Sequence, residues 1–291
     1  MPSFETPGPI TATIDVVVGD VRIIAGDGAT TVVDVRPSDA GSDEDRKVAE
    51  RTRVEHAGEV LIVKAPKLRS WLPRTHGGSI DVTVELPAGS QVYGTGQLTD
   101  FHAAGELGDT TIKTGLGQIQ LERAGAVNLK TGIGDITVGR ASGHADINAG
   151  SGEARVRELG GSAVVKNSNG DTWIGEITGN LRVNAANGRI SVDRACETVA
   201  AKSANGDVRL GEVGHGTVLA ETALGKVEIG IRDGVAAWLD LNTRFGSVHN
   251  DLGPTERPGP GEDAVEVRAR TSFGDITINR SVAADSEKDQ T

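Results

Sequence analysis

The sequence predicts an all-β protein: a single-chain β-solenoid (β-helix) of about nine 18-residue coils with an N-terminal β-rich cap. Three observations predict this fold. A glycine recurs about every 18 residues, apolar and polar residues alternate on both sides of it, and the 291-residue chain has 40 Gly but only four Phe, three Trp and one Tyr. Thin columns of Val, Ile, Leu and Ala, turned at glycine corners, account for all three observations.

The repeat is centred on a glycine in phrases such as Lys130-Thr-Gly-Ile-Gly-Asp-Ile and Lys202-Ser-Ala-Asn-Gly-Asp-Val. Successive repeat glycines are 17, 18, 18, 18, 18, 19, 21 and 28 residues apart. A tight corner in every coil requires a positive φ, which costs glycine least. The predicted structural corner glycines are Gly117, Gly134, Gly152, Gly170, Gly188, Gly206, Gly225, Gly246 and Gly274.

Short strands are expected on both sides of each corner. Apolar residues stand two and four positions after the glycine, as in Ile136 and Val138, and five and seven positions before it, as in Leu129 and Val127. The positions between them are mostly polar, and this period of two is typical of a strand with one buried face. Two short strands in about 18 residues make one coil of a β-solenoid.

The first part of the chain lacks the period and is expected to form longer strands. The charged stretch 39–55 is expected to be a loop or one short helix. A cap here would protect the end of the solenoid from edge-to-edge aggregation. The predicted strands are 10–18, 21–24, 31–35, 60–63 and 80–86. The predicted organisation is a cap region 1–90 continuous with the solenoid, solenoid repeats 91–280 with a Pro/Gly loop 253–263, and a disordered tail 281–291.

Charge and cysteine content limit the function classes. The formal net charge of −11 opposes nonspecific binding to nucleic acid or anionic membranes, so neither a nucleic-acid partner nor membrane insertion is expected. The single cysteine, Cys196, excludes an internal disulfide framework and a cysteine-rich metal site. The N-terminus has no basic start and no apolar run, so we expect a cytoplasmic protein, with a surface location left open.

The sequence resembles the bacterial DUF4097 β-strand-repeat family, whose members are also labelled adhesins. The resemblance lies in the recurring Thr/Ser-x-x-Gly-Asp-Ile/Val phrase, the entry strand 79–90, the segment 236–241 and the closing segment 265–276. It covers almost the whole chain. Several coils depart from the phrase, with Leu-Gly-Gln, Asn-Gly-Arg or Phe-Gly-Ser in its place. The resemblance implies a β-solenoid and brings no catalytic residues with it.

A calcium ladder is the first candidate site that we considered. Aspartates follow a glycine at Asp109, Asp135, Asp171, Asp207 and Asp275. The position after the repeat glycine also holds Arg189 and Lys226, and a column of calcium ligands cannot include cations. We therefore interpret these aspartates as turn residues and expect no metal and no cofactor. The fragment Gly115-Leu-Gly117 lacks the rest of a phosphate-binding loop.

Catalysis is not expected. The histidines are scattered without a common spacing, and no serine lies in a nucleophile elbow. They are His56, His76, His102, His144, His215 and His249. A glycan- or polyanion-binding β-helix with enzymatic activity stays as the alternative, because some β-helices cleave polysaccharides.

One basic segment is a candidate partner contact. Lys67, Arg69, Trp71 and Arg74 lie within eight residues of an acidic chain, and Arg and Trp are enriched in interface hot spots. The alternative for this segment is a loop whose tryptophan packs onto the cap. Trp173 is expected to point outward, and the tryptophan beside the Leu239 column, Trp238, is expected to pack.

These observations predict a noncatalytic interaction or scaffold protein that uses the flat polar face of a solenoid. Its partner would be a protein or a second copy of the chain. By resemblance, its role would be adhesin-like.

Overall fold

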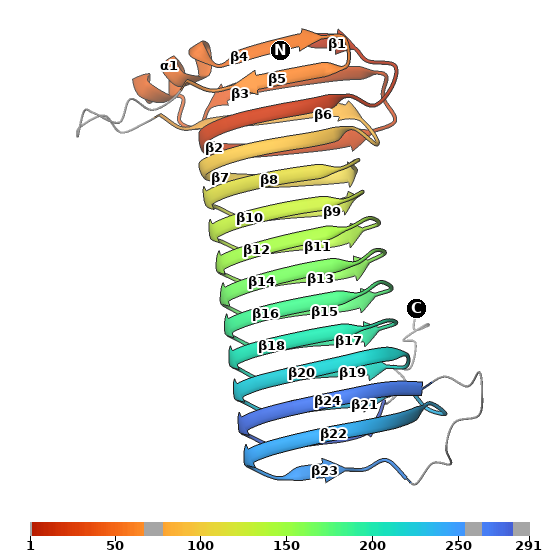
Figure 1. Ribbon diagram of the computed structural model, residues 1–291. Coiled ribbons are helices and arrows are strands. Elements are labelled where there is room, and N and C mark those ends of the chain that lie inside the picture. The colour runs from red at the N-terminus through yellow and green to blue at the C-terminus, as the bar shows by residue number, and fades with distance from the viewer. Residues whose placement is uncertain (1, 67–77, 254–263, 282–291) are drawn as a thin grey trace, which may run out of the picture. The chain divides into compact units, whose positions relative to one another are not determined.

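The computed structural model describes residues 2–66, 78–253 and 264–281. It divides into two compact units, Met1–Trp173 and Ile174–Thr291. The described secondary structure is almost entirely strand, with one nine-residue helix, so the predicted all-β class is confirmed. In each unit, strands from successive coils pair in parallel, which confirms the predicted β-solenoid (Figure 1).

The first unit contains the N-terminal elements and the first repeats. They are β1 (Ser3–Glu5), β2 (Thr11–Gly26), β3 (Thr30–Pro37), α1 (Asp43–Arg51), β4 (Arg53–Ala57), β5 (Val60–Lys64), β6 (Ile80–Pro87), β7 (Gln91–Glu106), β8 (Thr110–Leu116), β9 (Ile119–Ala124), β10 (Val127–Ile133), β11 (Ile136–Ala141), β12 (Ala145–Ser151), β13 (Ala154–Leu159) and β14 (Ala163–Asn169). The next strand, β15 (Thr172–Ile177), begins in this unit and ends in the second.

The long strand β2 organises the N-terminal part. Two predicted strands are joined here into one 16-residue strand that bends at Gly19, where φ is +146°. One edge of β2 pairs in parallel with β5 and β6, and the other pairs with β7. The charged stretch contains the helix α1, because the hydroxyl of Ser42 caps it by accepting a hydrogen bond from the Asp45 N–H at 3.2 Å.

Parallel pairing without a register shift builds the core of the first unit from β8 to β13. Leu129 of β10 lies opposite Ile112 of β8 on one side and Ile147 of β12 on the other, and all three side chains are fully buried. The strands β9, β11 and β13 form a second such stack. Side chains of one kind therefore repeat at the strand spacing of about 4.8 Å, and the alternate positions face outward.

The nine repeat glycines all have a positive φ, between +135° and +157°. This is a region of backbone conformation that essentially only glycine adopts. Space is the second constraint: a Cβ on Gly134 would lie 2.1 Å from the carbonyl oxygen of Gly117 in the preceding coil, and one on Gly152 would lie 2.3 Å from that of Gly134. The corner column also includes Gly19 and Thr99, which precede the first repeat glycine in the sequence.

At most of the repeat corners, a buried or half-buried hydroxyl or amide binds the glycine carbonyl of another coil. The side chain three positions before the repeat glycine donates this hydrogen bond in both units. The bonds are Thr131 Oγ1 to Gly117 O (2.9 Å), Asn167 Nδ2 to Gly152 O (3.1 Å), Thr222 Oγ1 to Gly206 O (2.8 Å), Thr271 Oγ1 to Gly225 O (3.0 Å) and Thr243 Oγ1 to Gly274 O (2.9 Å).

Replacing Thr131 by valine is expected to lower the free energy of unfolding by about 1–2 kcal/mol, because the Gly117 carbonyl loses a buried donor while the side-chain volume is kept. Denaturant titration of the full chain measures the loss. Thr131→Ser keeps the hydroxyl and should lose less. A cost for Thr131→Val no larger than that of Thr111→Val, on the outer side of β8, would contradict the bond's role.

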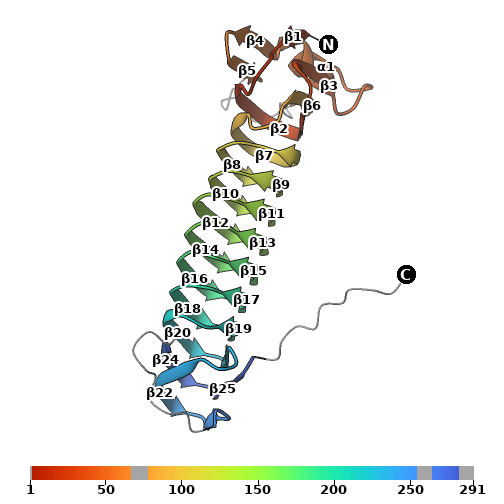
Figure 2. The same ribbon diagram turned by 90° about the vertical axis from the view of Figure 1, so that its right-hand side faces the viewer.

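The second unit stacks its coils in an order that differs from the chain order. Its strands are β16 (Leu181–Asn187), β17 (Ile190–Ala195), β18 (Val199–Asn205), β19 (Val208–Val213), β20 (Gly216–Leu224), β21 (Val227–Ile231), β22 (Ala236–Phe245), β23 (Val248–Asn250), β24 (Ala264–Phe273) and β25 (Ile276–Arg280). The strand β24 pairs with both β20 and β22, and β25 pairs with both β21 and β23 (Figures 1 and 2). The last coil of the chain is thus inserted before the preceding one.

The prediction that Trp238 packs against the core is wrong. Its side chain is 62% exposed and lies opposite Glu266 on the outer side of β24. Leu239 faces inward, so strand alternation turns its neighbour outward. Because β22 belongs to the outermost coil, even Leu239 is only half-buried.

Several predicted features lie outside the described residues. They are the partner-contact residues Lys67, Arg69, Trp71 and Arg74, the Pro/Gly loop apart from Gly253, and the tail apart from Ser281. The partner contact at these four residues stays a prediction.

Candidate functional site

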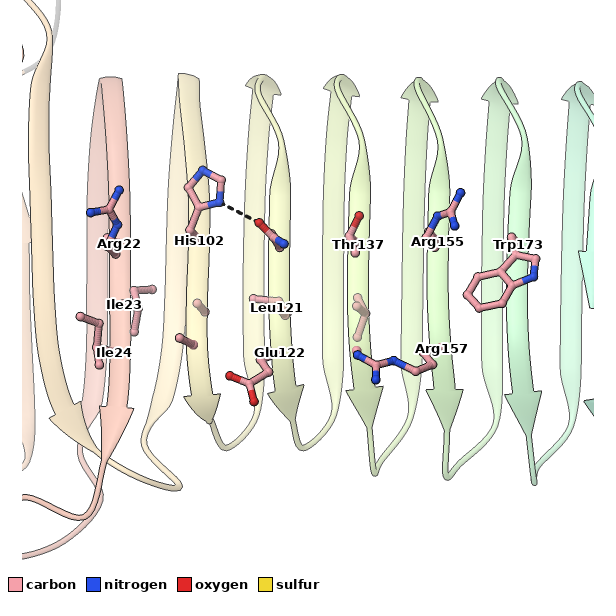
Figure 3. A pocket seen from close by; sticks show the side chains of 15 residues that line it. Arg22, Ile23, Ile24, His102, Leu121, Glu122, Thr137, Arg155, Arg157 and Trp173 are labelled. Carbon is pink, nitrogen blue, oxygen red and sulfur yellow. Dashed lines mark hydrogen bonds between the residues drawn. The ribbon is translucent and has the colours of Figure 1, made fainter. Parts of the chain in front are cut away.

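The outer face of the first unit carries a groove of about 630 Å³ that crosses the strands β2, β7, β9, β11 and β13 and reaches Trp173 at the start of β15 (Figure 3). Strand register places its side chains in a row. Arg22 lies opposite His102, which lies opposite Gln120, and Thr137 lies between Gln120 and Arg155. The groove therefore runs along the direction in which the coils stack.

Residue size explains why the face is hollow here. Thr137 and Gly139 on β11 and Ala104 on β7 are small, whereas long side chains stand on the neighbouring strands. The guanidinium of Arg157 reaches toward Gly139, since a Cβ there would lie 3.5 Å from Arg157 Nη2. Short side chains between long ones leave a trough on a surface that is otherwise flat.

Cationic and aromatic groups gather at one end of the groove. The guanidinium carbon of Arg155 lies 5.4 Å from the ring centroid of Trp173, a cation–π contact. Arg155 Nη2 also donates to Glu153 Oε1 at 2.6 Å. Trp173 lies on the outer face, as the alternation of β15 predicts. Because the guanidinium is held between a ring and a carboxylate, its remaining N–H donors are oriented before any ligand arrives.

At the other end of the groove, the imidazole of His102 lies beside a carboxylate outside the lining, that of Asp20. His102 Nδ1 lies 3.2 Å from Gln120 Oε1, and His102 Nε2 lies 3.4 Å from Asp20 Oδ2. Partial burial raises the pKa of Asp20 above its usual range, although the nearby His102 and Arg22 oppose this effect. The carboxylate of Glu122 accepts a hydrogen bond from the Gly105 N–H at 2.9 Å, which fixes it to the backbone.

Four of the five aspartates considered as calcium ligands accept a hydrogen bond from a backbone N–H. Asp135 Oδ1 accepts a hydrogen bond from the Glu153 N–H of the next coil at 2.7 Å, and Asp207 Oδ1 accepts one from the Lys226 N–H at 2.9 Å. Asp109 and Asp275 make the same kind of bond. Within the described part of the chain, His, Cys, Asp and Glu side chains form no group of three that could hold a metal ion.

Of the histidines considered for catalysis, His102 lines the groove, and His56 stacks on Phe4 with ring centroids 4.7 Å apart. His76 lies outside the described residues.

Apart from His102 and Trp173, the residues of the groove were not identified from the sequence. The signal was present: Arg155 and Arg157 stand at outward positions of one strand, three and five residues after a repeat glycine, and Thr137 and Gly139 occupy the same positions one coil earlier. Comparing outward positions between adjacent coils would have found the groove.

Among the described residues, no helix is long and apolar enough to cross a membrane.

The chain belongs to the family described as Toastrack DUF4097, whose model matches residues 13–279. This confirms the family resemblance drawn from the repeat phrases. No curated protein matches the chain.

Solved structures similar to this chain include one from Bacteroides fragilis and two from Parabacteroides distasonis. A putative adhesin from Bacteroides fragilis is 13% identical, with 95% of each chain covered and a TM-score of 0.39. A putative adhesin from Parabacteroides distasonis is 16% identical, with 95% of each chain covered and a TM-score of 0.38. A putative lipid binding protein from the same species is 13% identical, covers 96% of this chain and 95% of its own, and has a TM-score of 0.33.

Proposed function

We propose that the chain is a noncatalytic, adhesin-like binding protein whose groove in the first unit holds an acidic polysaccharide. One observation carries the proposal: the guanidinium groups of Arg22, Arg155 and Arg157 and the indole of Trp173 line a single hollow in a chain of net charge −11. Cations concentrated on one face of an acidic protein favour a ligand with negative charge along its length.

The chemistry of the lining fits a carboxylated sugar chain. A guanidinium binds a carboxylate through two parallel hydrogen bonds, and such charge-assisted bonds are among the strongest in proteins. An indole offers an apolar face against which a sugar ring can lie. The groove crosses strands about 4.8 Å apart, so a linear ligand would meet an outward position of each strand at regular intervals.

The polar groups of the groove favour binding over cleavage. Glu122 is tied to the Gly105 backbone, while His102 and Asp20 lie on β7 and β2, away from the arginines of β13. Most enzymes that hydrolyse a glycosidic bond use two carboxyl groups that flank the bond. Glu122 has no second carboxyl group opposite it among the residues that line the groove.

Isothermal titration calorimetry with an oligogalacturonate tests the proposal. We expect the wild-type chain to bind it, more weakly as ionic strength rises. The double variant Arg155→Gln/Arg157→Gln should raise the dissociation constant at least about tenfold, since losing one charge-assisted bond of about 1.5 kcal/mol corresponds to a tenfold change. The fully methyl-esterified oligomer, which lacks the charge, should not compete.

Arg209→Gln is the matched control, because Arg209 occupies the outward position equivalent to that of Arg155 in a coil of the second unit that does not line the groove. It should leave the affinity unchanged. Equal binding by wild type and the double variant would refute the groove as the site. Shortening of the oligomer during incubation would refute the noncatalytic role in favour of a polysaccharide-cleaving enzyme.

The proposal has two further parts. The chain has no nucleic-acid partner, and it is located in the cytoplasm. A single-stranded oligonucleotide that displaces the oligogalacturonate would contradict the first. Fractionation of the native cell tests the second, and recovery in the envelope fraction would place the groove among surface polysaccharides instead.

A further inference from the structure

The outermost coil of the second unit, formed by β22 and β23, presents an open cross-section of its core. The inward column Val218 and Val267 is fully buried, but its next member, Leu239, is only half-buried. The column of Val227 and Ile276 is fully buried as well, and its next member, Val248, is 43% exposed. The same positions therefore change from core to surface within one coil.

The backbone of this coil is open too. The ten-residue strand β22 pairs with β24 along one edge, and β23 pairs with β25; neither has a partner on its other edge among the described residues. A long exposed edge with apolar side chains is a template for pairing with another strand. Trp238 and Phe245 on this edge are 62% and 59% exposed.

In the first unit, by contrast, further strands cover the core beyond β2. There β2 is followed by β5 and β6, and the side chains of Ile14 and Val16 on β2 are fully buried. The segments of the second unit outside the described residues, 254–263 and 282–291, hold only one large aliphatic residue between them, Val282. Their composition does not match the apolar end of β22 and β23.

We infer that a second copy of this chain covers the open coil, with the two β22 strands pairing antiparallel about a twofold axis at Asn242. Under this symmetry each residue lies opposite the partner residue that is equally far from Asn242 on its other side. Asp240 then faces the partner's Arg244, and this pair occurs twice. Leu239 faces the partner's Phe245, so exposed apolar side chains meet.

The charge pattern of β22 favours a copy of itself over an unrelated strand. Asp240 and Arg244 are equally distant from Asn242 and opposite in charge, which makes the outer side of the edge self-complementary. Both side chains are accessible: that of Asp240 is 41% exposed while its carboxylate lies 3.6 Å from Arg270 Nη2, and Arg244 is exposed. An axis perpendicular to the two β layers of the coil also brings β23 beside its symmetry mate.

Sedimentation equilibrium of the full chain tests the inference. We expect a monomer–dimer equilibrium for the wild type. Asp240→Arg alone and Arg244→Asp alone place like charges opposite each other and should each weaken dimerisation at least about tenfold. The combined Asp240→Arg/Arg244→Asp exchange restores opposite charges and should recover the dimer. Glu228→Arg, at an exposed position of β21, should have no effect.

A wild-type chain that stays monomeric at every concentration would overturn the inference. It would also fail if the single variants dimerised as wild type does, or if the charge exchange did not restore the dimer. A cross-link gives an independent measurement: in a Cys196→Ser background, Asn242→Cys should form an intermolecular disulfide on oxidation, because the axis places each thiol beside its mate. Lys226→Cys in the same background should not, and equal cross-linking of both would contradict the placement of the axis.

Discussion

Replacing Gly134 by alanine is expected to lower the free energy of unfolding by about 3 kcal/mol or more. Two costs combine at this corner. The φ of +138° lies in a region that side-chain-bearing residues rarely adopt. The added Cβ would also lie 2.1 Å from the Gly117 carbonyl oxygen and 2.6 Å from its carbon. Both atoms are backbone in a strand stack, so neither can move without disturbing the next coil.

Gly58→Ala is the comparison in the ordinary left-handed region, where no collision occurs. Gly58 also has a positive φ, +59°, but a Cβ there would meet nothing within 4 Å. This control should lose only about 1 kcal/mol, the cost of the backbone conformation alone. The midpoint of denaturant unfolding of the full chain measures both variants. Equal losses would contradict the prediction, because they would show that neither the collision between coils nor the corner conformation near +138° costs more than an ordinary left-handed residue.

The repeat could be predicted because it is local. One turn of the coil occupies consecutive residues, so spacing and alternation in the sequence give strand, corner and inward face directly. The coils of β2 and β7 are harder to recognise, because Thr99 occupies the corner where glycine is expected and long strands continue through it. The hydroxyl of Thr99 is buried and donates to the Val16 carbonyl at 2.8 Å, which offers a physical reason for a non-glycine corner.

The stacking order of the last coils could not be predicted from the same pattern. The strands β22 and β24 carry equivalent residues, Leu239 with Val267 and Phe245 with Phe273, so either could follow β20. Which one does is decided by long-range packing. The wrong prediction for Trp238 has another cause, because the alternation that turns Leu239 inward turns Trp238 outward in either order.

The groove was missed for a related reason. It depends on differences in side-chain length between outward positions of adjacent coils, such as Thr137 beside Arg155. Reading these differences requires the register between coils. Glycine spacing gives that register only where the period is regular, and β2, which supplies Arg22, lies outside the regular repeats.

Replacing Phe101 by alanine is expected to cost about 3–5 kcal/mol of unfolding free energy, because Phe101 of β7 is fully buried and its removal leaves a cavity in the core. Phe101→Leu should lose about 1.5 kcal/mol or less. Tyr93→Ala on the same strand is the surface control, since Tyr93 is 44% exposed, and should change stability by only about 0.5 kcal/mol. Denaturant unfolding of the full chain measures all three, and a Phe101→Ala loss as small as that of Tyr93→Ala would contradict the packing.

Two glycines outside the corner column make room for this ring. A Cβ on Gly94 would lie 2.8 Å from Phe101 Cε1, and one on Gly96 would lie 3.2 Å from Phe101 Cε2. Gly94→Ala should therefore destabilise the wild type more than it destabilises Phe101→Leu, where the shorter side chain leaves space for a methyl group. A double-mutant cycle measures this coupling. Additive losses would show that these glycines are not needed to leave space for the Phe101 ring. The scarcity of aromatic residues and the abundance of glycine would then have separate causes at this coil.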